Sequence, residues 1–159
     1  MTDTTTAAVA RPGARAGQSN EFTMITALKP GGAERMRALF ADGFTGPRQA
    51  NTDRIGTVHD LRFIIFDDDT RIMFASTYDG DWDAYMDDFG TIIPDEIDLL
   101  FHECVDYPGV RSPRFKDWAV SVQIPAVAFY SAYPDTSVRD VWKAVQTKQA
   151  FDNLLDVAA

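Results

Sequence analysis

The chain has few cysteines, little positive charge and no long apolar run. Its single cysteine, Cys104, permits no internal disulfide and suits a reducing compartment, so a cytoplasmic location is expected. The 15 Lys and Arg residues are outnumbered by 24 Asp and Glu, and this net charge of −9 argues against nucleic acid and anionic lipid as partners. Because no apolar run approaches the ~20 residues that cross a bilayer, no membrane partner is expected either.

Residues 1–20 also lack the apolar segment of a secretory signal. They are rich in Thr, Ala and Gly, so we expect a flexible N-terminal tail. Residues 21–159 are long enough for a single domain, and the hydrophobic content of 45% is ample material for its core.

Sequence fingerprints of cofactor sites are missing as well. The chain contains no Gly-x-Ser-x-Gly motif, no Walker motif and no dinucleotide fingerprint. The acidic run Asp67–Asp69 is typical of a hairpin turn, because it has too few correctly spaced oxygen ligands for a calcium loop. The sequence therefore predicts no cofactor.

Strand and helix patterns alternate along the rest of the chain. Four segments have strand alternation or composition, at residues 21–28, 58–66, 71–78 and 126–133. Helices are predicted from about residue 33, over 82–89, from Pro94 and after the Thr136/Ser137 cap. Residues 115–123 favour a short helix over a strand, and the polar residues 45–56 are expected to form a loop. Asp79 is the expected N-cap of the helix over 82–89.

This order is β-α-β-β-α(α)-β-α, the split βαβ or ferredoxin-like arrangement. It predicts an α+β fold with a four-stranded antiparallel sheet. The segments FTMITALKPGGAERMRAL and VAFYSAYPDTSVRDVWKA support it, because both run strand, proline, cap, helix. Helices cover only one face of such a sheet, so a partner subunit is expected to cover the other, which implies a homodimer.

The second predicted strand carries the two candidate catalytic residues, His59 and Arg62. Alternation along a strand places His59 with Leu61 and Phe63 on one face, and Arg62 with Asp60 on the other. A half-buried imidazole serves well as a general base or proton donor, and an arginine stabilises a developing anion. The structural alternatives are a satisfied core histidine and an ion pair between Arg62 and Asp60.

Three aromatic residues are candidates for substrate binding: Tyr78, Trp82 and Tyr107. Aromatic side chains build apolar pockets that hold flat molecules well. Trp82 also belongs to a stripe with Tyr85, Met86 and Phe89 at helical spacing, which is equally typical of a plain core face.

His102 and Cys104 lie close together in sequence, but their spacing is unsuited to a metal site. Ligands on one helix converge at i, i+3 or i+4 spacing, and a structural zinc site needs about four of them. We therefore expect a surface or interface histidine and an inert core thiol.

The opening strand-Lys-Pro-Gly-helix segment at residues 22–40 and the run from His59 to Phe89 resemble the dimeric α/β-barrel superfamily. In that superfamily two ferredoxin-like subunits close their sheets into one barrel. The pattern His-x-x-Arg, then Phe-Asp-Asp, then Tyr-Asp-Gly-Asp-Trp-Asp-x-Tyr is similar to a set of peroxidase-like bacterial proteins, over roughly residues 21–145. The Gly-x-x-Asp-Gly signature of dye-decolourising peroxidases is absent, which argues against a reaction with hydrogen peroxide.

The superfamily includes cofactor-free monooxygenases and cyclases of aromatic polyketide pathways. The resemblance thus implies a homodimeric enzyme of secondary metabolism that oxygenates or cyclises a hydrophobic, aromatic or polyketide-like small molecule. His59 would be the general acid/base and Arg62 the anion stabiliser, with Tyr78, Trp82 and Tyr107 around the substrate. The alternatives are a haem-binding, peroxidase-like or dioxygenase-like protein with His59 or His102 as axial ligand, and a non-catalytic metabolite-binding module.

Overall fold

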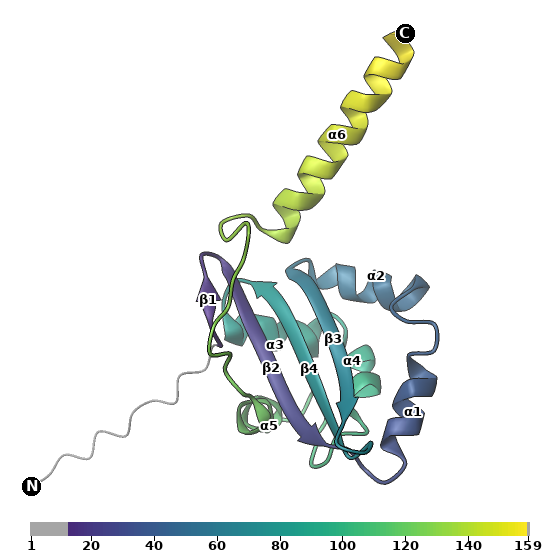
Figure 1. Cartoon of the computed structure of the whole chain (residues 1–159), viewed down its shortest axis with the longest axis vertical. Coiled ribbons are helices and arrows are strands. Elements are labelled where there is room, and N and C mark those ends of the chain that lie inside the picture. The colour runs from purple at the N-terminus through teal and green to yellow at the C-terminus, as the bar shows by residue number, and fades with distance from the viewer. Residues whose placement is uncertain (1–12, 159) are drawn as a thin grey trace, which may run out of the picture.

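The computed structural model describes residues 13–158, which form an α+β fold built on a four-stranded antiparallel sheet (Figure 1). Its strands are β1 (Arg15–Ala16), β2 (Ser19–Ala27), β3 (Val58–Phe66) and β4 (Arg71–Asp79), in the spatial order β1-β2-β4-β3. The helices are α1 (Gly32–Leu39), α2 (Gly46–Ile55), α3 (Trp82–Thr91), α4 (Pro94–Phe101), α5 (Phe115–Val122) and α6 (Val138–Ala158). The α+β class and the antiparallel sheet of four strands are confirmed.

The β3–β4 hairpin is confirmed at its predicted position. Three consecutive aspartates, Asp67 to Asp69, form its turn with φ angles of 52°, 50° and 66°. Aspartate adopts this left-handed region more readily than most residues, because its short side chain hydrogen-bonds locally. Thr70 closes the turn by donating its hydroxyl to the Asp67 carbonyl over 2.6 Å.

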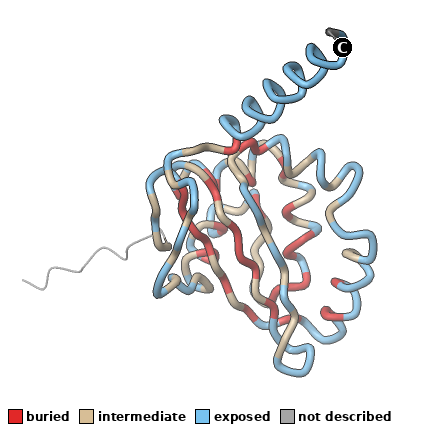
Figure 2. The backbone as a smooth tube through the Cα atoms, turned by 45° about the horizontal axis from the view of Figure 1, so that its top comes forward, coloured by how far each residue is buried: buried red, intermediate tan, exposed pale blue. Residues whose placement is uncertain are grey.

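The core lies between one face of the sheet and the helices behind it (Figure 2). Phe22 and Met24 of β2 and Ile72 and Phe74 of β4 alternate with side chains on the opposite face, as the period of two requires. Each helix of this layer contributes the apolar face expected from its spacing. These faces include Met36 of α1, Tyr85, Met86 and Phe89 of α3, Leu100 and Phe101 of α4, and Phe115 and Trp118 of α5.

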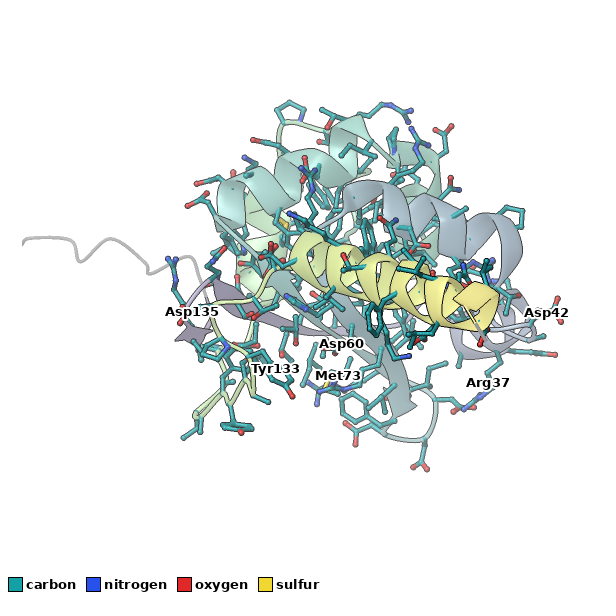
Figure 3. The ribbon with its side chains drawn as sticks, turned by 90° about the horizontal axis from the view of Figure 1, so that it is seen from above. Arg37, Asp42, Asp60, Met73, Tyr133 and Asp135 are labelled. Carbon is teal, nitrogen blue, oxygen red and sulfur yellow. The ribbon has the colours of Figure 1, made fainter. Side chains whose placement is uncertain are left out.

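No helix covers the other face of the sheet (Figure 1) within the described part of the chain. Seen from above, Asp60 and Met73 lie on this helix-free side (Figure 3). Ile64 also lies on this side of the sheet and is 44% exposed. The described residues include no helix long and apolar enough to cross a membrane.

The prediction of a loop at residues 45–56 is wrong, because Gly46–Ile55 form the helix α2. A proline in the first turn and Gly56, the C-cap at φ 71°, mark the ends of this helix. Only Ile55 of α2 is buried, so the sequence carries little of the apolar periodicity that announces a helix.

The strand predicted at residues 126–133 is also wrong. The segment meets the sheet only at its ends. The Ile124 amide donates to the Thr23 carbonyl of β2 over 2.8 Å, and the amide of Gln18, in the turn between β1 and β2, donates to the Pro134 carbonyl over 2.8 Å. Between these points the Glu21 carboxylate replaces a strand partner: Oε1 accepts from the backbone amides of Ala14 at 3.0 Å and Ala126 at 2.8 Å. The edge position in the sheet belongs instead to β1, so strand structure begins before residue 21, while residues 1–12 lie outside the described part.

Replacing Glu21 with Ala should destabilise this edge by about 1–3 kcal/mol, because two amides lose their acceptor. Hydrogen exchange of the Ala126 amide should accelerate, and urea unfolding should report the stability loss. Glu34→Ala is the control, since Glu34 is an exposed glutamate of α1. Unchanged exchange at Ala126 would mean that Glu21 does not hold the segment.

Candidate functional site

His59 lies at an irregularity in β3. Val58 pairs with Tyr78 and Asp60 pairs with Thr77, which leaves His59 as an extra residue between two regular pairs. Strict alternation therefore fails here: Val58, not His59, packs against the core on the side of Leu61. The predicted common face of His59 and Leu61 is wrong for this reason.

The bulge turns His59 towards Asp79 at the end of β4. The distance from His59 Nε2 to Asp79 Oδ1 is 2.6 Å, and 23% of the His59 side chain and 9% of the Asp79 side chain are exposed. The second carboxylate oxygen of Asp79 accepts from the backbone amide of Val138 at 2.8 Å, at the first turn of α6. Asp79 thus joins the histidine to the base of the C-terminal helix.

The sequence suggested Asp79 as the N-cap of α3, and this prediction is wrong. That role belongs to Asp81, which accepts from the Asp83 amide at 2.8 Å and from the Ala84 amide at 3.4 Å. Asp79 is therefore available for His59, a pairing that no local pattern announces because the two residues are 20 positions apart.

The pairing fixes the chemistry of the imidazole. A carboxylate only accepts hydrogen bonds, so Nε2 of His59 carries the proton that it donates to Asp79. Nδ1 then keeps its lone pair in the neutral ring, and within residues 13–158 no hydrogen bond to Nδ1 accompanies the contact with Asp79. A histidine oriented by a carboxylate in this way is a suitable general base.

His59 lines a cavity of about 250 Å³ between α2 and β3, here called the His59 pocket. Its walls are formed by Phe44, Gln49, Thr52, Asp53, Val58, His59, Asp60 and Leu61. Phe44, Val58 and Leu61 make one part apolar, and Gln49, Thr52 and Asp53 of α2 supply polar groups. Five of the eight lining residues are polar or charged, so the pocket offers apolar contact on one side and hydrogen-bonding groups on the other.

A second cavity of about 390 Å³, here called the Phe40 groove, lies beside it between α1 and β3. It is lined by Met36, Arg37, Phe40, Gly43, Phe44, Leu61, Arg62, Phe63, Ile65 and Ile72. The Phe40 ring packs on Phe44 at 5.6 Å and on Phe63 at 4.8 Å between centroids. Phe44 and Leu61 are shared with the His59 pocket, so together they separate the two cavities.

Arg62 lines the Phe40 groove and also a cavity of about 150 Å³ on the helix-free face of the sheet, and it does not line the His59 pocket. Its guanidinium contacts Asp60 over 3.4 Å, and 60% of the Arg62 side chain is exposed. An exposed pair at this distance stabilises the fold little. The structure therefore places the two candidate catalytic residues on one strand but in different cavities.

Of the three predicted substrate-binding aromatics, Tyr78 and Trp82 are buried in the core and Tyr107 is half-buried against it, and none of them lines either cavity. The Tyr78 ring stacks on Tyr85 with 4.0 Å between centroids, and burial raises the pKa of Tyr78 well above its ordinary value. Tyr107 donates its hydroxyl to Asp98 over 2.7 Å, and Trp82 is 3% exposed. The residues of α2 that do line the pocket were missed because α2 was expected to be a loop; Pro47 and Gly56 were the available signals.

His102 lies at the surface, with 53% of its side chain exposed. Its Nδ1 lies 2.8 Å from the Leu99 carbonyl and its Nε2 lies 2.8 Å from Glu103 Oε1. Cys104 is fully buried, and burial raises the pKa of its thiol to about 12. In the described part of the chain, no group of three or more His, Cys, Asp or Glu side chains could hold a metal ion.

Glu103 is a buried carboxylate that accepts two hydrogen bonds from Arg35, at 2.7 and 2.6 Å. These bonds lower the pKa of Glu103 below its ordinary value of about 4.3. A lowered folded-state pKa means that the pair stabilises the fold above pH ~4.3 and that this contribution is lost as the pH falls through the folded pKa.

Glu103→Gln should therefore be less stable than the parent at pH 7, with a difference that shrinks as the pH falls below about 4.3. Urea midpoints measured from about pH 7 to pH 3 give this difference directly. Glu34→Gln, at an exposed position, should show no such trend. A constant difference across the range would contradict the assignment.

Comparisons with known proteins return nothing similar to this chain: no family model matches, and neither do curated proteins or solved structures. The resemblance to the dimeric α/β-barrel superfamily therefore stays a prediction.

Haem does not fit the residues present. The His59 pocket, at about 250 Å³, is below the roughly 300–1,000 Å³ of sites that enclose drug-sized ligands, and haem is larger still. The Nε2 atom of His59 is held by Asp79, and both ring nitrogens of His102 have partners at the surface. His102 is therefore not placed as an axial ligand, and His59 could ligate only through Nδ1, in a pocket smaller than haem.

Proposed function

We propose that this protein is an acid–base enzyme acting on a small molecule that combines an apolar ring with a polar group, in the His59 pocket. The single observation that carries this proposal is the 2.6 Å contact between His59 Nε2 and Asp79, beside a cavity that His59 itself lines. The contact supports a fixed tautomer with Nδ1 as the proton acceptor. Arg62 has no part in this step, because it lines the neighbouring cavity.

The pocket favours a one-ring substrate with a carbonyl or hydroxyl group. A volume of about 250 Å³ suits a small molecule, and Phe44 and Leu61 offer flat apolar contact. Nδ1 of His59 would take a proton from the carbon next to a carbonyl, and the electron pair of that C–H bond would move onto oxygen to form an enolate. Gln49 has an amide donor for this oxygen, since its side-chain NH₂ can stabilise negative charge.

Proton transfer of this kind is a step shared by cyclisations and cofactor-free oxygenations of aromatic compounds. The proposal thus retains the reaction class implied by the resemblance, with His59 as general acid/base and with Asp79 added as its positioning residue. The ferredoxin-like topology is part of the same proposal. It is supported by the order β2-β4-β3 and by the segment 123–134, which meets the edge of β2 at Ile124 and the turn before β2 at Pro134.

Hydrogen–deuterium exchange into a panel of one-ring aryl ketones, acetophenone first, tests the proposal. In D₂O, the wild-type protein should accelerate the incorporation of deuterium at the carbon next to the carbonyl. Proton NMR measures this as loss of the proton signal of that carbon. The exchange needs no second reactant, because the proton that His59 removes is replaced by a deuteron from solvent. Rates equal to the buffer rate across the panel would contradict the proposal.

A structural role is the second candidate, and the bond from the Val138 amide to Asp79 favours it. In that case the histidine would only complete the anchor of α6. His59→Gln would then release the base of α6, measured as faster hydrogen exchange of the Val138 amide, while any bound ring compound would keep its affinity.

A further inference from the structure

The carboxylate of Asp79 lies between His59 and the first turn of α6. Its Oδ1 atom is 2.6 Å from His59 Nε2, and its Oδ2 atom accepts from the Val138 amide over 2.8 Å. Both contacts are shielded from water, because only 9% of the Asp79 side chain and 6% of Val138 are exposed. One oxygen of this carboxylate is thus committed to the candidate base and the other to α6.

These two contacts fix a group that could otherwise turn. The backbone of Asp79 is held at the end of β4, where its amide donates to the Thr57 carbonyl over 2.8 Å. The carboxylate can still rotate about the last bond of the side chain, because that torsion has only a broad preference in aspartate. A hydrogen bond on each oxygen removes this freedom. The Val138 amide therefore helps to determine where the oxygen that faces His59 lies.

The first turn of α6 is itself well held. Ser137 Oγ accepts from the Asp140 amide over 3.2 Å, and the Asp140 carboxylate accepts in return from the Ser137 amide over 3.0 Å. Such reciprocal bonds are those of a capping box. Val138 begins the helix, so its amide lacks an acceptor within α6 and is available to Asp79. The positive end of the helix dipole also favours a carboxylate at this point.

Arg139 connects the same turn of α6 to α2. Gly56 is the C-cap of α2, and a Cβ atom added at Gly56 would lie 3.5 Å from Arg139 Nε and 3.6 Å from Arg139 Nη2. The guanidinium therefore lies against the carboxyl end of α2, where the helix dipole favours a cation. Because α2 supplies the polar wall of the His59 pocket, the base of α6 contacts both walls, β3 through Asp79 and α2 through Arg139.

Beyond its first turn, α6 stands away from the domain (Figure 1). From Arg139 to Val157 every residue is exposed, as the pale blue tube shows (Figure 2). The docking of α6 on the described part of the chain thus depends on the contacts at its base. Coupling between two sites is reciprocal, so contacts that hold the helix in place also hold the groups that it touches.

We propose that Val138 and Arg139 are positioning residues of the acid–base site, and that the docking of α6 sets the orientation of the His59 ring. With the helix docked, Asp79 holds the ring by Nε2 and leaves Nδ1 as the proton acceptor. When the base of α6 is released, the carboxylate turns and the ring loses its fixed orientation. The catalytic consequence rests on the proposed acid–base function, whereas the orientation of the ring can be measured without a substrate.

Replacing Val138 with Pro tests the role of its amide in the full chain. Proline has no amide proton and is well tolerated at the first position of a helix. Nitrogen-15 NMR is recorded in the His102→Gln background, where His59 is the only imidazole. We expect the Nε2 resonance of His59 to shift and its proton to exchange with water several-fold faster. Val138→Ala is the conservative variant: it truncates the side chain but keeps the amide, so it should retain the wild-type spectrum.

Arg139→Gln is the second variant, which changes only an exposed side chain and decides the matter if Val138→Pro does not fold. Hydrogen exchange of the Val138 amide should accelerate several-fold, and the Nε2 resonance should move in the same direction as in Val138→Pro. Lys143→Gln is the matched control, because Lys143 is an exposed cation one turn further along α6. It should change neither measurement.

A wild-type His59 spectrum in folded Val138→Pro would overturn the proposal, and so would an Arg139→Gln variant that behaves like Lys143→Gln. The catalytic consequence is measured with acetophenone: its deuterium exchange at saturating ketone should be slower in Val138→Pro than in Val138→Ala, with unchanged affinity. If the wild type exchanged no ketone of the panel, the acid–base function would fail, while the His59 spectra would still decide whether α6 orients the ring.

Discussion

Replacing His59 with Gln should slow deuterium exchange into a bound aryl ketone by about 100- to 10,000-fold, the usual contribution of a general base. Glutamine keeps a polar side chain of similar length but offers no basic nitrogen. The loss should appear in the exchange rate at saturating ketone, because the apolar walls formed by Phe44 and Leu61 remain. Proton NMR of the ketone gives the exchange rates of the wild type and of His59→Gln.

The matched control is His102→Gln, which removes the other histidine of the chain. That residue lies at the surface, outside both cavities, so its replacement should leave the exchange rate unchanged. The exchange rate of Asp79→Asn should lie between the rates of His59→Gln and His102→Gln, since this variant keeps the His59 ring but changes its orientation and tautomer. Exchange in His59→Gln at the wild-type rate would exclude His59 as the base.

Replacing Phe74 with Ala should cost about 3–5 kcal/mol of unfolding free energy, a large part of the roughly 5–15 kcal/mol typical of a domain. Phe74 is 2% exposed and its ring lies 4.9 Å from that of Phe63 and 5.3 Å from that of Phe101. The truncation leaves a cavity where the sheet meets α4. Urea unfolding monitored by tryptophan fluorescence measures the loss.

Tyr130→Ala is the comparison for this prediction, because Tyr130 is also aromatic but 86% exposed. Its replacement should change the stability by no more than about 0.5 kcal/mol. If Phe74→Ala cost less than about 1 kcal/mol, Phe74 could not be at the centre of the core described above.

The parts of the fold that were predictable from sequence are those governed by local patterns. The β3–β4 hairpin follows from β-rich runs around three aspartates, and the start of α4 follows from Pro94 with acidic residues in its first turn. The face of α3 follows from residues at i, i+3, i+4 and i+7. In each case the signal and the structure span the same few residues.

The errors arise where a distant contact overrides the local pattern. Residues 126–133 alternate like a strand, but the Glu21 carboxylate takes the hydrogen bonds that a neighbouring strand would have made. In α2 the structure is present but the local pattern is missing. Only Ile55 of this helix is buried, so its sequence lacks the apolar periodicity of a helix.

The candidate site shows the same division. His59 could be selected from the sequence because it is one of only two histidines and lies on a predicted strand. Its partner Asp79 could not, because a bulge between Val58 and Asp60 reorients the ring. Local capping chemistry assigned Asp79 to the start of α3, where Asp81 is the cap. The contacts of Asp79 with His59 and Val138 exist only after β3, β4 and α6 have assembled.

The nitrogen-15 NMR spectrum of the His59 ring in the His102→Gln variant tests the central claim most directly, because only one imidazole remains. The expected spectrum has a proton on Nε2, with that proton lost from Nε2 in Asp79→Asn and with a change in the Nδ1 resonance when acetophenone is added. A ring protonated on Nδ1, or one that does not respond to the ketone, would contradict the proposed role of His59.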